Sequence, residues 1–219
     1  MNLGELRAKV SRKVGFTSAS PDQDFAGPAS DTWKYIDDGI NEAYADECSK
    51  AQNEAGSHWF RRVVEATWPS GEQLFVIPDA VKQSQIYAIM DVTGDTGRGR
   101  PLYMGGILTE SSVTWREPGV LEWRDAGPGS DVDLRFHYVA SAVRMTTATQ
   151  EPELIPEAHR WLLVWSAACI LRDEADEAAP GRWISRRDEL RKTFHKQLSK
   201  ARPMATGPWG TEDSYYAGA

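Results

Sequence analysis

An apolar segment from Trp161 to Leu171 constrains the fold of this chain more than any other stretch of its sequence. Arg160 and Arg172 bound the segment, and apolar side chains occupy nearly every face of the helix that it predicts. It is far shorter than the roughly 20 residues that a helix needs to span a bilayer. We therefore expect a helix of a soluble protein, buried on nearly all sides by other parts of the chain.

Helical periodicity also marks both ends of the sequence. Residues 3–14 and 31–51 repeat apolar side chains at spacings of three and four, which predicts two amphipathic helices. After the break at Pro180-Gly181, residues 183–198 predict a third amphipathic helix that carries many basic residues. With the apolar segment, the pattern indicates two helices before the middle of the chain and two after it.

The middle of the chain changes to the period of β-strands. Strands or strand segments are expected at residues 59–68, 72–77, 81–92, 103–115, 119–124 and 132–138. The last of them alternates apolar and polar side chains without interruption, which is typical of a half-buried strand. Pro69-Ser70-Gly71 and the Gly-rich residues 93–101 predict turns between strands.

This order predicts an α+β fold: a four-helix bundle formed by the N- and C-terminal helices, with a β-sheet insertion between them and an extended C-terminal tail. We place the N-terminal helices of the bundle at residues 1–57 and the β-rich insertion at 58–145. The C-terminal helices of the bundle follow at 146–201 and a docking tail at 202–219.

The charges of the chain are segregated along its sequence. Its net charge of −7 argues against a general nucleic-acid binder. The first predicted helix is nevertheless basic, the second is acidic, and residues 182–202 are strongly basic. Opposite charges on one chain suit head-to-tail self-association, in which one surface meets a different surface of the next copy. The alternative is that these charges only solvate the helix faces. The residues expected at subunit interfaces are Arg7, Arg12, Asp37, Asp38, Arg186 and Arg187.

No catalytic or metal-binding pattern stands out. The four histidines are scattered, and the glycines at 94, 97 and 99 lack the Gly-Lys-Ser/Thr ending of a phosphate loop. Cys48 and Cys169 suit buried free thiols in a reducing cytoplasm, and the first residues lack the apolar stretch of a secretory signal. We expect no enzyme, no catalytic residue, no metal and no cofactor, although carboxylates paired only in space are invisible at this stage.

The C-terminal residues combine Pro and Gly with aromatic side chains. Trp209, Tyr215 and Tyr216 follow the basic segment that ends at Arg202. Aromatic residues in such a tail are typical anchors for the groove of a partner protein, with ordinary terminal disorder as the alternative.

Three segments together resemble the head-to-tail adaptor (connector) proteins of tailed double-stranded-DNA bacteriophages. They are Asn2 to Val10 (NLGELRAKV), Trp33 to Ala43 (WKYIDDGINEA) and Leu154 to Leu163 (LIPEAHRWLL). The resemblance implies a ring of copies, commonly twelve, beneath the portal at the neck of the virion, assembled in the host cytoplasm. Its implied partners are other copies of the chain, the portal protein, tail or nozzle proteins and double-stranded DNA in transit, with no membrane.

The same resemblance assigns the C-terminal helix and tail to docking on the portal. The residues expected there are Arg191, Lys196, Arg202, Trp209, Tyr215 and Tyr216. A head-closure or tail-terminator protein is the alternative within the same particle. A small terminase subunit, which binds DNA through a basic N-terminal helix, is an alternative from another class.

Overall fold

A computed structural model of the chain shows two compact units. The structure describes residues 1–15, 30–55, 57–79, 81–94, 99–110, 112–124, 126–175 and 178–200. The helical unit comprises Met1–Trp59 and Ser141–Ala219, and the β unit comprises Phe60–Ala140. The β unit is thus inserted in sequence between two parts of the helical unit.

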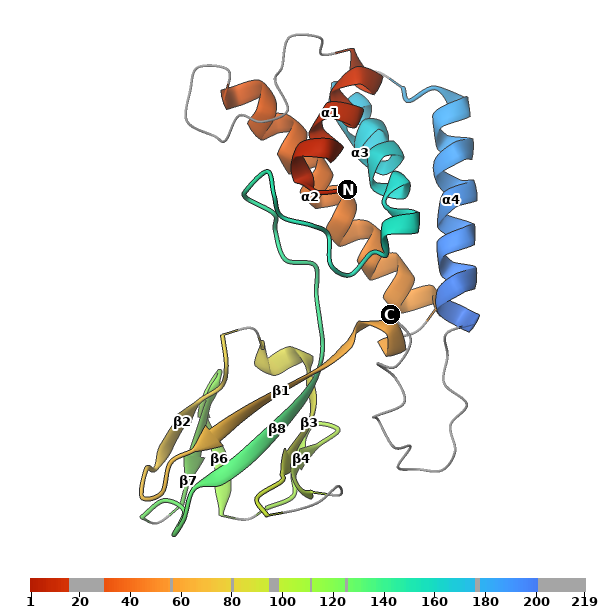
Figure 1. The fold of residues 1–219 in the computed structure, drawn as a ribbon. Helices are drawn as coiled ribbons and strands as arrows, with labels where there is room; N and C mark the ends of the chain where they lie inside the picture. The colour runs from red at the N-terminus through yellow and green to blue at the C-terminus, as the bar shows by residue number, and fades with distance from the viewer. Residues whose placement is uncertain are drawn as a thin grey trace. The chain divides into compact units, whose positions relative to one another are not determined.

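The helical unit contains four helices within the described residues (Figure 1). They are α1 (Leu3–Val14), α2 (Ser30–Ala55), α3 (Trp161–Glu174) and α4 (Gly181–Lys200). Short 3-10 helices span Ser57–Phe60 and Glu157–His159. Helices α2 and α3 pack on each other and each also contacts α1 and α4, whereas α1 and α4 have no comparable contact in the described part of the chain.

Local sequence explains where α1 begins and ends. The Asn2 side chain accepts a hydrogen bond from the backbone N–H of Glu5, and the Glu5 carboxylate accepts one from the N–H of Asn2, which is a capping box. Gly15 ends the helix with a φ of 89°, a left-handed conformation that glycine adopts without strain. The apolar stripe between them is fully buried at Leu3, Leu6 and Val10.

Helix α3 is the most deeply buried element of the helical unit. The side chains of Leu162, Leu163, Val164, Ala167 and Ala168 are 0% exposed. Exposed residues occur chiefly at the two ends of the helix. The all-round apolar surface expected from the sequence therefore has protein on nearly every side.

Residues 141–156, between the β unit and the 3-10 helix before α3, contain no helix or strand and contact α2. The Asn41 amide donates to the backbone oxygen of Met145 and accepts from its N–H, at 3.0 and 2.7 Å. Further along, the backbone N–H of Leu154 donates to the Tyr44 hydroxyl. These bonds satisfy backbone groups that no helix or strand would pair.

The β unit consists of eight antiparallel strands within the described residues, arranged in two sheets. They are β1 (Arg61–Trp68), β2 (Leu74–Val76), β3 (Ile86–Asp91), β4 (Arg100–Met104), β5 (Ile107–Leu108), β6 (Val113–Glu117), β7 (Val120–Trp123) and β8 (Val132–Val139). One sheet has the order β1-β8-β3-β4-β5 and the other β2-β7-β6. Strands β1 and β8 pair along their whole length, from Arg61 opposite Val139 to Trp68 opposite Val132.

The two sheets share one apolar core. Phe75 of the smaller sheet lies 5.4 Å from Trp68 and 6.0 Å from Phe136 of the larger sheet, measured between ring centres. Leu121 and Ile89, one from each sheet, are 0% exposed in the same cluster. Aromatic contacts between layers explain why alternate residues of these strands are apolar.

The predicted fold class was wrong as stated. The chain is α+β, but two antiparallel sheets replace the single β-sheet insertion, because β2, β6 and β7 pair with one another and cover the larger sheet. The helices also do not surround one shared central core as a four-helix bundle does, since the α2–α3 pair occupies the centre with α1 and α4 flanking it. The expected tail, residues 202–219, lies outside the described residues.

Residues 103–115 were expected to contain strand segments, and the structure divides them among three strands. β4 ends at Met104, β5 spans Ile107–Leu108 and β6 starts at Val113. Gly105 and Gly106 have φ angles of 58° and 96°, so the chain reverses there in a tight turn. A hairpin of short strands results.

The contact between α2 and α3 depends on Gly39. A Cβ atom at this position would lie 2.7 Å from Cδ2 and 2.8 Å from Cγ of Leu171. We predict that Gly39→Val lowers the free energy of unfolding by about 1–3 kcal/mol through overpacking. Ser49→Val, at an exposed position of the same helix, should change it by less than about 0.5 kcal/mol. Urea denaturation of both variants measures this, and equal stabilities would contradict the close approach.

Candidate interaction surfaces

Two of the predicted interface residues pair with each other inside the helical unit. Arg7 donates from Nε and Nη2 to the two carboxylate oxygens of Asp37, at 2.6 and 2.7 Å, and both side chains are 0% exposed. Burial raises the pKa of Asp37, while the hydrogen bonds from Arg7 act in the opposite direction. The pair joins α1 to α2, so the structure gives both charges a partner within the chain.

The other predicted interface residues lie nearer the surface. Arg12 is exposed on α1, and Asp38 forms an ion pair with Arg144. Arg186 contacts Glu189 at 2.6 Å and Arg187 contacts Asp188 at 2.9 Å, both pairs within α4. Exposed pairs of this kind contribute little stability, and their charges stay accessible to another molecule.

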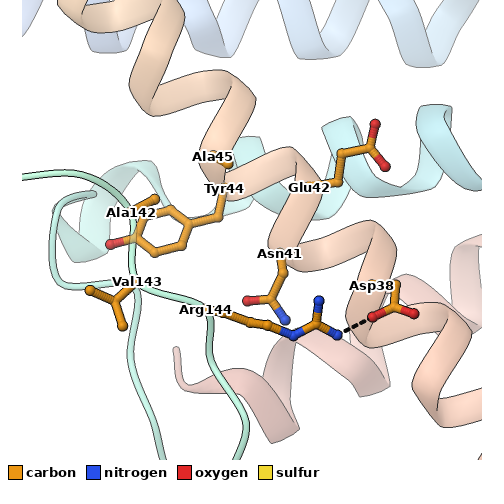
Figure 2. A pocket seen from close by; sticks show the side chains of 8 residues that line it. All are labelled: Asp38, Asn41, Glu42, Tyr44, Ala45, Ala142, Val143 and Arg144. Atoms are coloured by element: carbon orange, nitrogen blue, oxygen red, sulfur yellow. Dashed lines mark hydrogen bonds and ion pairs between the residues drawn. The ribbon is translucent and has the colours of Figure 1, made fainter.

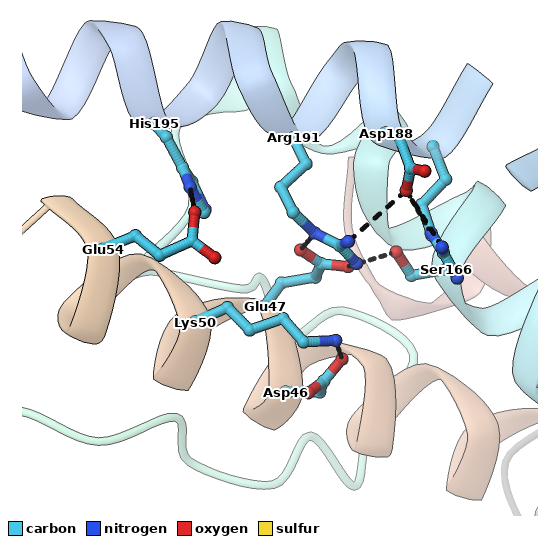
Figure 3. Close-up of polar contacts among 9 residues, drawn as sticks. Asp46, Glu47, Lys50, Glu54, Ser166, Asp188, Arg191 and His195 are labelled. Carbon is cyan, nitrogen blue, oxygen red and sulfur yellow. Dashed lines mark hydrogen bonds and ion pairs between the residues drawn. The ribbon is translucent and has the colours of Figure 1, made fainter. Parts of the chain in front are cut away.

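Arg191, predicted to bind a partner, instead joins α4 to α2 (Figure 3). Its guanidinium donates to both carboxylate oxygens of Glu47, at 2.5 and 2.7 Å, and Glu47 is 0% exposed. The Ser166 hydroxyl of α3 donates to the same carboxylate at 2.6 Å. This network therefore joins α2, α3 and α4. One turn further along α4, His195 contacts Glu54 of α2 at 2.8 Å.

The outward side of α4 forms a basic stripe. Arg182, Arg186, Lys196 and Lys200 recur at spacings that place them on one face, together with Glu189 and Thr193, and all six are exposed. Trp183, Phe194 and Leu198 are buried on the opposite side of the helix. Of the basic residues, only Arg186 has an ion pair within the described part of the chain. Lys196 was a predicted portal-binding residue; Arg202, Trp209, Tyr215 and Tyr216 lie outside the described residues.

A second basic surface combines lysines of α1 with tryptophans of α3; we call it the Lys–Trp ridge (Lys9, Lys13, Trp161 and Trp165). The Lys9 ammonium lies 4.5 Å from the ring centre of Trp161, and that of Lys13 lies 4.2 Å from the ring centre of Trp165. The second pair lies four residues after the first on both helices, so α1 and α3 run parallel. Trp161 is 43% exposed, and within the described residues neither lysine has a carboxylate partner.

A hollow of about 340 Å³ opens beside α2 (Figure 2). We call it the α2 hollow (Asp38, Asn41, Glu42, Tyr44, Ala45, Ala142, Val143 and Arg144). Its apolar part includes Ala45 and Val143, and Val143 is 77% exposed. Arg144 pairs with Asp38, whereas Glu42 has no ion pair among the described residues, so the hollow is acidic on balance.

Groups that could perform chemistry are dispersed over the described part of the chain. No cluster of three His, Cys, Asp or Glu residues there is arranged to hold a metal ion. Cys48 and Cys169 are free and buried, and burial raises the pKa of the Cys48 thiol to about 12. His159 contacts Gln197 and Phe194, which places it against α4.

The ridge and the hollow did not emerge as sites from the sequence. One signal for the ridge was present, because the four-residue spacing of Lys9 and Lys13 matches that of Trp161 and Trp165. Nothing in the sequence indicated which helices are neighbours or that Trp161 keeps an exposed ring. The hollow had no sequence signal, since Val143 lies 98 residues after Ala45 in the sequence.

The function has to be argued from these surfaces. A scan against protein-family models finds no match, and a search of curated proteins finds none either. No helix in the described ranges is both long and apolar enough to cross a membrane.

The pairing of Arg191 with Glu47 predicts a large structural effect. Arg191→Met leaves the buried Glu47 carboxylate without its cation, which costs about 3–5 kcal/mol for a buried pair. We expect the lower end of that range, because Arg191 is 17% exposed. Denaturant unfolding measures the loss, and Glu47→Gln in the same chain should restore part of it.

Arg187→Met is the matched control. Its ion pair with Asp188 is more exposed, so the free energy of unfolding should change by at most about 1 kcal/mol. Equal losses for the two arginine variants would contradict the structural role of Arg191.

Proposed function

We propose that this chain is a structural virion protein, a head-to-tail adaptor whose copies form a ring between the portal and the tail and let DNA pass. It acts by docking and oligomerisation, and no bond is made or broken. The residues that resemble adaptor proteins support the proposal. The observation that carries it is the basic stripe on α4.

The stripe is suited to docking because α4 is fixed from its inner side. Buried Trp183 and Phe194 and the Arg191–Glu47 pair hold the helix against α2 and α3. The outward charges of Arg182, Lys196 and Lys200 therefore project from a rigid support. In a chain of net charge −7, such a stripe favours encounter with an acidic surface on another protein.

Exposed charges steer association more than they hold a complex together. Affinity for the portal would come from apolar anchors, and Trp209, Tyr215 and Tyr216 follow α4 directly in sequence. We propose that the stripe orients the adaptor on the portal and that these aromatic residues supply the anchors.

DNA binding, as in a small terminase subunit, is the second candidate because the stripe also suits phosphates. A mobility-shift titration at several salt concentrations separates the two. A DNA binder loses affinity with a slope of about −0.9 per phosphate contact in a plot of log K against log salt. The adaptor proposal predicts weak binding to DNA and tight binding to the portal.

Electron microscopy of virions assembled with this protein tests the proposal directly. We expect a ring of copies between the portal and the tail. Its absence from the neck, or its presence only in complexes with free DNA, would contradict the adaptor function.

Charge reversal on α4 tests the stripe. Lys196→Glu with Lys200→Glu should slow association with the portal, and removal of residues 203–219 should weaken equilibrium binding by roughly tenfold or more. Lys34→Glu with Lys82→Glu makes the same change in net charge at exposed positions outside α4 and should leave association near that of the wild type. Surface plasmon resonance on immobilised portal measures both quantities, and unchanged kinetics for the α4 variant would contradict the role of the stripe.

A further inference from the structure

The Lys–Trp ridge is basic and the α2 hollow is acidic on balance, so the two surfaces have complementary charges. The ridge offers the partly exposed indole of Trp161 with the Lys9 ammonium over it, and the Lys13 ammonium lies over Trp165 one turn further on. The hollow offers an apolar recess next to the unpaired Glu42 carboxylate. Both belong to the helical unit, and neither has a role in the docking of α4 described above.

The exposed ring of Trp161 is an unusual feature for a surface side chain. Lys9 covers one part of the indole, and 43% of the side chain remains in solvent. Tryptophan is among the residues that contribute most to protein interfaces when it enters a pocket. The neighbouring ammonium groups lack carboxylates among the described residues, so they are available to a partner's acidic group.

The α2 hollow has dimensions for one large side chain. Its volume of about 340 Å³ lies at the lower end of the roughly 300–1,000 Å³ of small-molecule pockets. Figure 2 shows Tyr44 with Ala142 and Val143 on one side, while Arg144 reaches Asp38 on the other. Glu42 points away from Arg144 in the same view, and its side chain is exposed.

Trp161 contacts Lys9 of its own chain and does not line the hollow, so the ridge of a chain does not occupy its own hollow. Arg7 points from α1 into α2, where it meets Asp37. Lys9 is two residues further on, about 200° around the helix, and meets Trp161 of α3 instead. The hollow lies on α2 next to Asp37, at Asp38 and Glu42.

We infer that the Lys–Trp ridge of one copy docks into the α2 hollow of a second copy. Trp161 enters the apolar recess beside Ala45 and Val143, and Lys9 and Lys13 face Glu42. The contact joins two different surfaces, so each copy keeps a free ridge or a free hollow for the next copy. Such a contact closes into a ring when its rotation allows closure.

This inference rests on the proposed function, because it names the subunit contact of the proposed ring. The occupant is a second copy, since the chain itself supplies both complementary surfaces. An unrelated acidic partner on the ridge, or an unrelated basic partner in the hollow, is an outcome of the test that follows.

Mixing two full-length variants tests the contact. Trp161→Ala removes the partly exposed side chain and keeps the hollow, whereas Ala45→Trp fills the hollow and keeps the ridge. Each variant alone should be monomeric, with self-association weakened by roughly 30-fold or more, as for an interface anchor. An equimolar mixture should form a heterodimer and nothing larger, because only one ridge and one hollow remain compatible. Sedimentation velocity and native mass spectrometry measure the species.

Matched controls separate assembly from stability. Ser49→Trp places the same side chain at an exposed position of α2 outside the hollow, and Ile184→Ala removes an apolar side chain that is 38% exposed on α4. Both should assemble as the wild type does. Thermal unfolding of every variant identifies any that is monomeric only because it is unfolded.

A purely structural role for Trp161 would lower the melting temperature of Trp161→Ala and leave its mass distribution unchanged, which would overturn the inference. A mixture that stays monomeric overturns it as well, and points to an unrelated partner for each surface. A wild-type chain that is monomeric at every concentration also overturns it. The adaptor function is decided separately, by whether virions show the protein at the neck.

Discussion

The rest of the helical unit depends on the burial of α3. A helix with apolar side chains on nearly every face has to be covered on nearly every face, and burying each large aliphatic side chain contributes about 1.5–3 kcal/mol. Helices α1, α2 and α4 supply that cover. Their polar contacts follow from this arrangement: Glu47 of α2 meets Ser166 of α3 and Arg191 of α4 where the three helices converge. A buried carboxylate at that point is tolerated because its hydrogen bonds are satisfied.

The helices themselves could be predicted from the sequence, whereas their pairing could not. The apolar stripe of residues 3–14 and the Gly15 stop are local signals, and α1 occupies those residues. Arg7 and Asp37 are thirty residues apart on separate helices, so the sequence presented them as two opposite surface patches. The structure pairs them inside the fold instead. Arg191 was likewise predicted for the surface, because a basic residue on a basic helix gives no sign of a buried partner.

In the β unit, too, single strands could be predicted from the sequence but their pairing could not. Alternation in residues 132–138 predicted β8, since side chains of a strand alternate between two faces. The separation into two sheets depends on which strands pair, and neither the alternation nor the turns between strands specify that. Trp161 illustrates the limit for a candidate site: a tryptophan at the start of an apolar helix is expected in the core, and nothing in the sequence indicates that 43% of its side chain stays exposed.

The position of the β unit in the sequence has a consequence for how the protein folds during synthesis. Strands β1 and β8 are the first and last strands of the unit, and the backbone oxygen of Phe60 accepts from the N–H of Ala140 beside them. The β unit can therefore complete its core as soon as its own residues have left the ribosome. Helices α1 and α2 emerge earlier but have to wait for α3, whose Leu171 packs against Gly39 of α2. The nascent chain is thus most prone to aggregation, and most in need of a chaperone, while its first-made helices are waiting for its later ones.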